Sequence, residues 1–215
     1  MVRMIRAVVF DWNGTLVDDM AIHLRAFREV LRGMADIKPI DIYLREGKRS
    51  IDIISELAKG ASRERVREAW HAKEKIYKEN SQGIRMLPSG RDLVRKLRGE
   101  GLKVGLVTGT RRSSLSHVLT RQEMSMFDHI TTANETKKAK PDPEPYLRCI
   151  DDLGVKPWEA VAVENAPLGV ESAKAAGMFC IAITSTLPEK YLARADSVVA
   201  TLDEADSVIE SMTKT

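Results

Sequence analysis

Six short runs of mostly apolar residues, spaced along a chain of 215 residues, do most to limit its possible folds. They span residues 5–10, 103–108, 128–132, 160–163, 179–184 and 197–200. Consecutive apolar residues over such short lengths are typical of strands buried on both faces, whereas strands with one wet face alternate apolar and polar residues. The runs therefore predict a parallel sheet that is covered by helices on both sides.

Helical patterns alternate with these runs in the second part of the chain. They span residues 91–98, 112–120, 144–153 and 167–176. Pro143 and Pro167 fall near the first turn of two of them, where proline is tolerated, and Gly177 suits the position that follows a helix. Strand and helix thus alternate through residues 86–215, which predicts an α/β fold with a Rossmann-like, doubly wound parallel sheet as its core.

The segment of residues 17–85 interrupts this alternation. It contains no strand pattern but three helical ones, over residues 20–33, 50–59 and 63–78. We interpret it as a small inserted all-helical cap domain that follows the first strand. The core domain then comprises residues 1–16 and 86–215, and Pro88 and Gly90 mark where the chain returns to it.

Composition and charge argue against several classes of protein. The net charge is only +3, acidic and basic residues are interspersed, and aromatic residues make up 5% of the chain, whereas a nucleic-acid surface needs basic patches or stacking rings. No run approaches the roughly 20 apolar residues of a membrane span, and the apolar start is too short for a signal peptide. We expect a cytoplasmic monomer or homodimer without nucleic-acid or membrane partners. Cys149 and Cys180 lie among apolar residues and are expected to be buried free thiols.

An aspartate follows the first apolar run directly. Asp11 opens the segment DWNGTLVD and would lie at the carboxyl end of the first strand, where open α/β sheets bind their ligands. A carboxylate in that place can attack phosphorus and form an acyl phosphate. Gly14 would allow the tight turn that the chain needs there. The alternative is a structural aspartate that caps a turn.

Two further motifs follow later strands. After the second run come Thr108 and Gly109, whose hydroxyl and backbone N–H can bind phosphate oxygens, although this is also a common way for a strand to end. Lys140 stands before Pro141, which favours an extended backbone at the lysine. A lysine held there can neutralise charge on a phosphate and on a nucleophile. The alternative is a solvated surface lysine.

Glu164 and Asn165 end the fourth apolar run. Together with Asp11 they would present oxygen atoms at one edge of the sheet, and Mg²⁺ takes a few oxygen ligands from protein and keeps several waters. Asn165 could instead cap the following helix, and both roles can coexist.

In this order, the motifs resemble the haloacid dehalogenase superfamily. They read DWNGTL, then Thr108-Gly109, then KPDP from Lys140, then ENAPLGVESAKAAGM from Glu164. The resemblance extends over essentially the whole chain. The helical insert resembles the C1 cap of the β-phosphoglucomutase and phosphoglycolate phosphatase-like branch. Membership would imply Mg²⁺ as cofactor and an aspartyl-phosphate intermediate.

The resemblance also implies roles for single residues. Asp11 would be the nucleophile, Thr108 would bind phosphate with Gly109 beside it, and Lys140 would neutralise charge. The implied Mg²⁺ ligands are Asp11, the backbone carbonyl of Asn13, Asn165 and Glu164. In the cap, His23 resembles a histidine of the β-phosphoglucomutase-like branch. Independently of the resemblance, Arg49 could hold a second anionic group of the substrate, or it could belong to an exposed start of a helix.

Two positions depart from the family pattern. Asn13 stands where phosphatases and mutases of the family carry an aspartate as general acid and base, and an amide cannot transfer a proton. Asn165 stands where the family usually has an acidic metal ligand. His23 could supply part of the missing proton chemistry because histidine titrates near neutrality, or it could be a packed side chain.

We therefore predict a magnesium-dependent phosphatase that hydrolyses phosphate monoesters of small metabolites through an aspartyl-phosphate intermediate. One alternative is a β-phosphoglucomutase-like phosphomutase, against which Asn13 argues. Another is a catalytically weak phosphate-ligand binding protein, which both asparagines would favour. A phosphonatase is disfavoured because Ser50 stands where that branch has its cap lysine.

Overall fold

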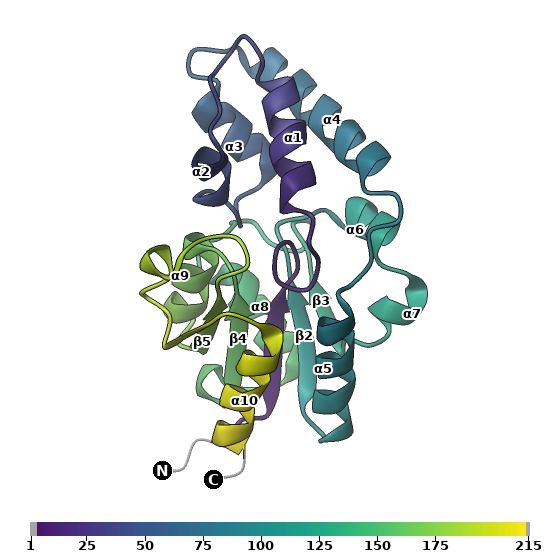
Figure 1. Cartoon of the computed structure of the whole chain (residues 1–215), viewed down its shortest axis with the longest axis vertical. Coiled ribbons are helices and arrows are strands. Elements are labelled where there is room, and N and C mark those ends of the chain that lie inside the picture. Colours follow the sequence, from purple (N-terminus) through teal and green to yellow (C-terminus); the bar gives the residue numbers. More distant parts are fainter. Residues whose placement is uncertain (1–3, 214–215) are drawn as a thin grey trace.

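The computed structural model describes residues 4–213 and has a parallel six-stranded sheet at its centre (Figure 1). The strand order is β3-β2-β1-β4-β5-β6. The strands are β1 (Ala7–Asp11), β2 (Lys103–Val107), β3 (His129–Thr131), β4 (Ala160–Glu164), β5 (Phe179–Ile183) and β6 (Ser197–Val199). Each lies within or overlaps one of the predicted apolar runs, and the predicted α/β fold class is confirmed.

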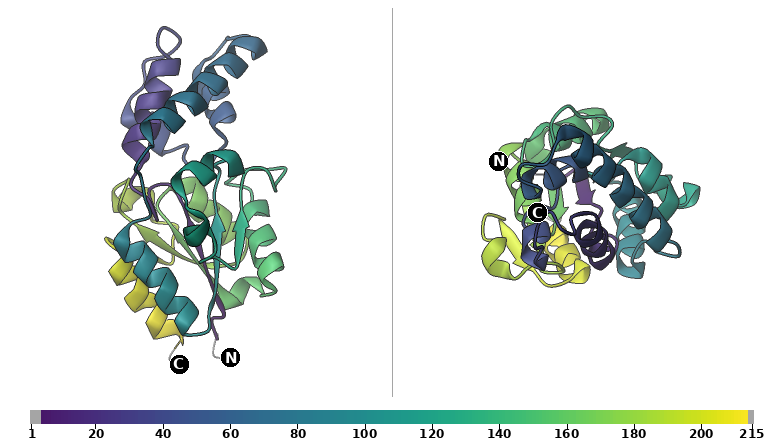
Figure 2. Two further views of the ribbon diagram at one scale, coloured as in Figure 1. Left: turned by 90° about the vertical axis from the view of Figure 1, so that its right-hand side faces the viewer. Right: turned by 90° about the horizontal axis from the view of Figure 1, so that it is seen from above.

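Helices cover both faces of the sheet (Figure 2). One face carries α5 (Pro88–Gly99), α6 (Arg112–Val118), α7 (Arg121–Met124) and α10 (Leu202–Thr213). The other carries α8 (Glu144–Leu153) and α9 (Pro167–Ala175). Two short 3-10 helices are η1 (Pro157–Glu159) and η2 (Glu189–Tyr191). Of these elements, α7, α10 and the two 3-10 helices were not predicted from the sequence.

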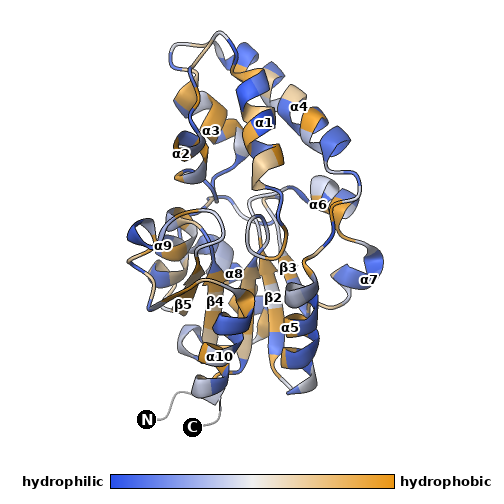
Figure 3. Ribbon diagram, viewed as in Figure 1, coloured by the Kyte–Doolittle hydropathy of each residue, from blue (hydrophilic) through white to orange (hydrophobic). Residues whose placement is uncertain are grey.

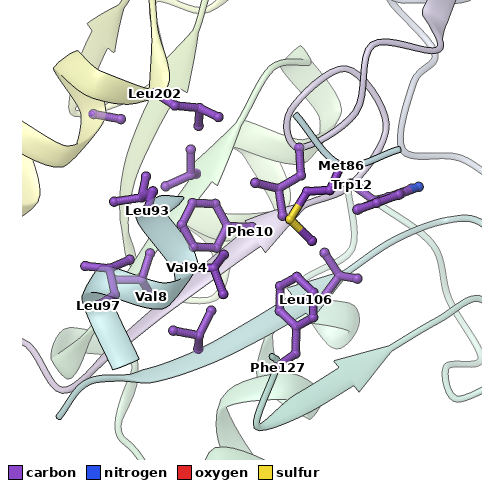
Figure 4. Close-up of a cluster of buried hydrophobic side chains, with 14 of the residues drawn as sticks. Val8, Phe10, Trp12, Met86, Leu93, Val94, Leu97, Leu106, Phe127 and Leu202 are labelled. Atoms are coloured by element: carbon purple, nitrogen blue, oxygen red, sulfur yellow. The ribbon is translucent and has the colours of Figure 1, made fainter. Parts of the chain in front are cut away.

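Alternate residues of β1 face the two helical layers. Val8 and Phe10 pack with α5 and α10, and Figure 4 shows Phe10 beside Val94 in this cluster. Ala7 and Val9 lie in the second cluster, with α8 and α9. Both faces of β1 are therefore dry, which is why its sequence reads as a continuous apolar run.

The order of the strands places a crevice at the carboxyl end of β1. The chain runs outward from β1 through β2 to β3, and then returns to the other side of β1 with β4. Asp11 pairs with Val107, and Phe10 pairs with Val163, so that the residues after these pairs meet at one edge. Ligand sites of open α/β sheets form where the order reverses in this way.

Four helices between β1 and α5 lie above this edge (Figure 1). They are α1 (Met20–Val30), α2 (Pro39–Tyr43), α3 (Ser50–Leu57) and α4 (Arg63–Asn80), called the cap helices below. They share a separate apolar cluster, in which Leu24 and Phe27 of α1 pack with Ile54 of α3 and Ala69 of α4. The sequence predicted three of these helices; the short α2 is additional.

Hydropathy is distributed as these layers require. Apolar residues concentrate in the strands and on the inner sides of the helices, while the outer surfaces are polar (Figure 3). Cys149 and Cys180 are free and buried, as predicted. Among residues 4–213, no helix is both long and apolar enough to cross a membrane.

Candidate active site

Three side chains that the sequence predicted together meet at the carboxyl ends of β1 and β4. Lys140 Nζ donates to Asp11 Oδ1 and to Glu164 Oε1, both at 2.6 Å. The Lys140 side chain is buried, so the alternative of a solvated lysine is wrong. Asp11 is the last residue of β1, and its Oδ2 atom is buried without a hydrogen-bond partner among the described residues. One carboxylate oxygen is thus anchored, and the other is left for a ligand.

The pKa values of Lys140 and Asp11 reflect both the burial of this cluster and its opposite charges. Burial alone would lower the pKa of Lys140, but the charges of Asp11 and Glu164 outweigh it and raise that pKa. Burial raises the pKa of Asp11 to about 7, against the opposite influence of the Lys140 ammonium. Lys140 therefore stays cationic and favours the ionised form of Asp11, which is the form that can act as a nucleophile.

Glu164 is fully occupied by protein donors. Besides Lys140, its Oε1 accepts a hydrogen bond from the Tyr146 hydroxyl at 2.7 Å, and its Oε2 accepts one from the Asn165 backbone N–H at 3.1 Å. The carboxylate is therefore better suited to hold Lys140 in place than to bind an ion directly.

Asn165 turns its side chain toward the loop after β1. Its Oδ1 accepts from the Thr15 hydroxyl at 3.2 Å, and its Nδ2 donates to the Thr186 hydroxyl at 2.8 Å. The residue before α9 is Ala166, with no side-chain cap, so the helix-capping alternative for Asn165 is wrong. Gly14 makes this approach possible: its φ is +76°, and a Cβ there would lie 2.2 Å from Asn165 Nδ2.

The residues present fit a hard cation such as Mg²⁺. The free Oδ2 of Asp11 is a buried carboxylate oxygen, and Asn165 Oδ1 accepts only one hydrogen bond from the described residues, at 3.2 Å. Oxygen atoms of this kind are the ligands that Mg²⁺ prefers. Within residues 4–213, no three His, Cys, Asp or Glu side chains cluster as a ready metal site. Mg²⁺ binding through Asp11, the Asn13 carbonyl, Asn165 and Glu164 stays a prediction.

Asn13 is fixed by partners on both ends of its amide. Its Oδ1 accepts from the hydroxyls of Thr110 at 2.9 Å and Thr108 at 3.3 Å. Its Nδ2 donates to Asp19 Oδ2 at 2.7 Å and lies 3.1 Å from His23 Nε2. The Thr108 hydroxyl therefore lies beside the site, and its predicted role in phosphate binding remains a prediction.

Asp19 and Tyr77 belong to this network, and sequence reasoning missed both. The Tyr77 hydroxyl donates to Asp19 Oδ2 at 2.6 Å, and the Tyr77 ring stacks on His23 with centroids 4.3 Å apart. Burial would raise the pKa of Asp19, but His23 and the hydrogen bonds of its partners lower it. Burial and the Lys73 ammonium lower the pKa of His23. At neutral pH the network thus holds an ionised aspartate and a neutral histidine.

A cavity of about 340 Å³ separates the cap helices from the core loops above this network. His23, Trp70 and Lys73 line it from the cap side, and Gly109 lines it from the core side. Arg49 also lines it, and one guanidinium nitrogen of Arg49 donates to the backbone carbonyls of residues 136 and 137, at 2.5 and 2.9 Å. Arg49 therefore joins the cap to the core, and its predicted contact with a substrate anion remains a prediction.

Comparison with known proteins identifies the family. A model of haloacid dehalogenase-like hydrolases matches residues 8–183. The chain belongs to this family. The resemblance stated from the sequence is confirmed, and so is the prediction of an enzyme, a haloacid dehalogenase-like phosphoric monoester hydrolase.

Curated relatives and solved structures agree with this membership. Hexitol phosphatase B from Escherichia coli (strain K12) is 31% identical over 84% of both chains. Validoxylamine A 7'-phosphate phosphatase from Streptomyces hygroscopicus subsp. limoneus is 35% identical, but over only 53% of this haloacid dehalogenase-like chain and 54% of that protein. The crystal structure of β-phosphoglucomutase from Clostridium difficile superposes with a TM-score of 0.84 over 98% of both chains, at 22% identity, and supports the fold alone.

Proposed function

We propose that this protein is a magnesium-dependent phosphatase that hydrolyses phosphate monoesters of small molecules through an aspartyl-phosphate on Asp11. One observation supports this most directly: Lys140 anchors Asp11 Oδ1, while Asp11 Oδ2 is buried without a partner within residues 4–213. Lys140 thus orients the carboxylate through one oxygen, and burial keeps the other oxygen away from bulk water. A carboxylate held in this way is prepared for attack on phosphorus.

The reaction has two steps at Asp11. In the first, its carboxylate attacks phosphorus, and the bond between phosphorus and the leaving oxygen breaks. In the second, water attacks the same phosphorus and releases the carboxylate with inorganic phosphate. Lys140 offsets negative charge on Asp11 and on the phosphoryl group, and the hydroxyl and N–H groups around Thr108 and Gly109 bind the phosphoryl oxygens. Bound Mg²⁺, held by Asp11, the Asn13 carbonyl and Asn165, would supply charge stabilisation for the same oxygens.

The substrates are small phosphorylated polyols or sugars. A cavity of about 340 Å³ accepts a ligand of this size, and hydroxyl-bearing and cationic side chains line much of it. The relative from Escherichia coli is named a hexitol phosphatase, which agrees with this class of substrate. A phosphomutase is less well supported, because Asn13 cannot pass protons to and from sugar hydroxyls in turn.

A phosphatase screen tests the proposal. Wild-type protein should release phosphate from p-nitrophenyl phosphate and from polyol or sugar phosphates with Mg²⁺. This activity should be lost after EDTA treatment and should return when Mg²⁺ is restored.

Asp11→Asn should abolish turnover and leave no acid-stable phosphoenzyme. Asp18→Asn, an exposed carboxylate in the same loop, is the matched control and should keep full activity. Full activity of Asp11→Asn would disprove the covalent mechanism, and a wild type that binds phosphate esters without hydrolysing them would favour the binding-protein alternative.

A further inference from the structure

Lys140 lies between two carboxylates that compete for its ammonium group. Its Nζ donates to Asp11 Oδ1 and to Glu164 Oε1, both at 2.6 Å, and to the Val107 carbonyl oxygen at 3.4 Å. An ammonium group has three N–H donors, so the protein uses all of them. A stronger interaction of Lys140 with Glu164 therefore weakens its interaction with the nucleophile.

The Tyr146 hydroxyl satisfies part of the hydrogen-bonding requirement of Glu164. It donates to Glu164 Oε1 at 2.7 Å, and this is the same oxygen that accepts from Lys140. Tyr146 belongs to α8, and its side chain is fully buried. A buried carboxylate that lacks donors is costly, so each donor from elsewhere makes Glu164 less dependent on the ammonium.

The Tyr146 ring contacts the ammonium as well. Lys140 Nζ lies 5.1 Å from the ring centroid, within the range of a cation–π interaction. One side chain thus acts on Lys140 in two ways, directly through its ring and indirectly through its hydroxyl and Glu164. Phenylalanine at this position would keep the ring and lose only the hydroxyl, so the two contributions can be separated.

Packing also fixes the Glu164 carboxylate. Gly169 of α9 lies against it, and a Cβ on this glycine would lie 2.1 Å from Glu164 Cδ. The other carboxylate oxygen, Oε2, accepts from the Asn165 backbone N–H at 3.1 Å. Because the carboxylate is held on several sides, the loss of one donor should act mainly on the mobile end of the Lys140 side chain.

We propose that Tyr146 is a positioning residue of this phosphatase, whose hydroxyl keeps Lys140 directed at the nucleophile. The inference rests on the proposed function, because it concerns the attack of Asp11 on phosphorus. With the hydroxyl present, Glu164 is stabilised by Tyr146 and by the Asn165 N–H, and the ammonium stays shared with Asp11. Without the hydroxyl, Lys140 moves toward Glu164, and Asp11 Oδ1 loses the contact that orients it.

Tyr146→Phe tests this role. A hydrogen bond to a charged group is worth about tenfold or more in an equilibrium, and we expect the maximal rate of phosphoenzyme formation to fall by about tenfold. Rapid-quench measurements with p-nitrophenyl phosphate give this rate. KM should change by less than about twofold, because the groups that line the cavity are unchanged. A change in KM alone would overturn the proposal in favour of a role in substrate binding.

A double-mutant cycle shows whether the hydroxyl acts through Glu164. In a Glu164→Gln background the competing charge is absent, so the addition of Tyr146→Phe should change the rate by less than about twofold. Equal losses in both backgrounds would overturn the proposal. If Tyr146→Phe leaves Glu164 unsatisfied and does not fold, the double variant removes both partners of that hydrogen bond. Its comparison with Glu164→Gln then decides, and a lower rate in the double variant would overturn the proposal.

Tyr191→Phe is the matched control, because it removes a hydroxyl that has no hydrogen bond within residues 4–213. It should leave the rate and KM unchanged. An active wild type with an unaffected Tyr146→Phe would overturn the proposal and leave the proposed function intact. A wild type that forms no phosphoenzyme would overturn both.

Discussion

At the scale of single residues, the side-chain amide of Asn13 provides the hydrogen-bond donor that the ionised Asp19 beside it requires. Its Nδ2 donates to Asp19 Oδ2 at 2.7 Å, while its Oδ1 accepts from two threonine hydroxyls. A carboxylate at position 13 could accept from the threonines but could not donate to Asp19 without carrying a proton. The amide therefore lets an ionised Asp19 remain beside the site, and the proton chemistry is left to another group.

The substitution Asn13→Asp should install a general acid. Two carboxyl groups about 2.7 Å apart cannot both ionise, so the pair retains one proton near the nucleophile. We expect alkyl phosphate turnover to rise by roughly tenfold or more. Steady-state kinetics with aryl and alkyl phosphates measure this, with Mg²⁺ affinity determined alongside because the new charge lies near the predicted metal site.

Asn80→Asp is the control for this prediction, since it makes the same change of charge at an exposed position at the end of α4. It should change the turnover of neither the aryl nor the alkyl phosphate. If Asn13→Asp does not raise alkyl phosphate turnover, the position of residue 13 is unsuited to proton transfer in this protein.

The sequence predicted only part of this site, for a geometric reason. Asp11, Thr108 and Glu164 end neighbouring parallel strands or follow them directly, and the register of a parallel sheet brings such positions together. Asp19 and Tyr77 are 58 residues apart and meet only because α1 and α4 pack together.

At the scale of elements, a strand or helix could be predicted where its residues form a recognisable pattern. The strands were predictable because dry strands read as continuous apolar runs, and the long α4 because its 18 residues contain neither proline nor glycine. The missed α10 carries a readable signal: Leu202, Ala205 and Ile209 recur at helical spacing and are all buried against the sheet. The five-residue α2 is too short to show any period.

Truncation of Leu97 should show how much α5 contributes to the stability of the fold. Its side chain is fully buried in the cluster that includes Phe10 and α10. Leu97→Ala should lower the free energy of unfolding by about 2–5 kcal/mol, the usual cost of removing a large apolar side chain from a packed core. Urea denaturation measures this. Arg95→Ala, exposed on the same helix, should change stability by less than about 0.5 kcal/mol.

At the scale of the whole molecule, polar contacts hold the cap helices against the core. Arg49 donates to backbone carbonyls in the loop that leads to Lys140, and Ser114 of α6 donates to Glu74 of α4 at 2.9 Å. The Arg111 guanidinium also lies 5.2 Å from the centre of the Trp70 ring. These contacts surround the cavity and hold the cap helices over the site, as in a closed form of a capped enzyme.

Arg49→Ala should shift this equilibrium toward an open form. Hydrogen bonds from a charged group are worth about 1.5–3 kcal/mol each, so losing them should raise the ratio of open to closed molecules by at least about tenfold. The radius of gyration from small-angle scattering should increase, and hydrogen exchange should accelerate where the cap meets the core. Because substrate binds the closed form, KM should rise in proportion to this ratio once the open form outnumbers the closed form, and should change little before that. Arg45→Ala removes the same side chain from the same turn, but its partners Asp41 and Glu56 lie within the cap, so it should leave all three measurements unchanged. If Arg49→Ala raises KM without changing scattering or exchange, Arg49 contacts the substrate directly, as the sequence first suggested, and the closed form is held by the cap's other contacts.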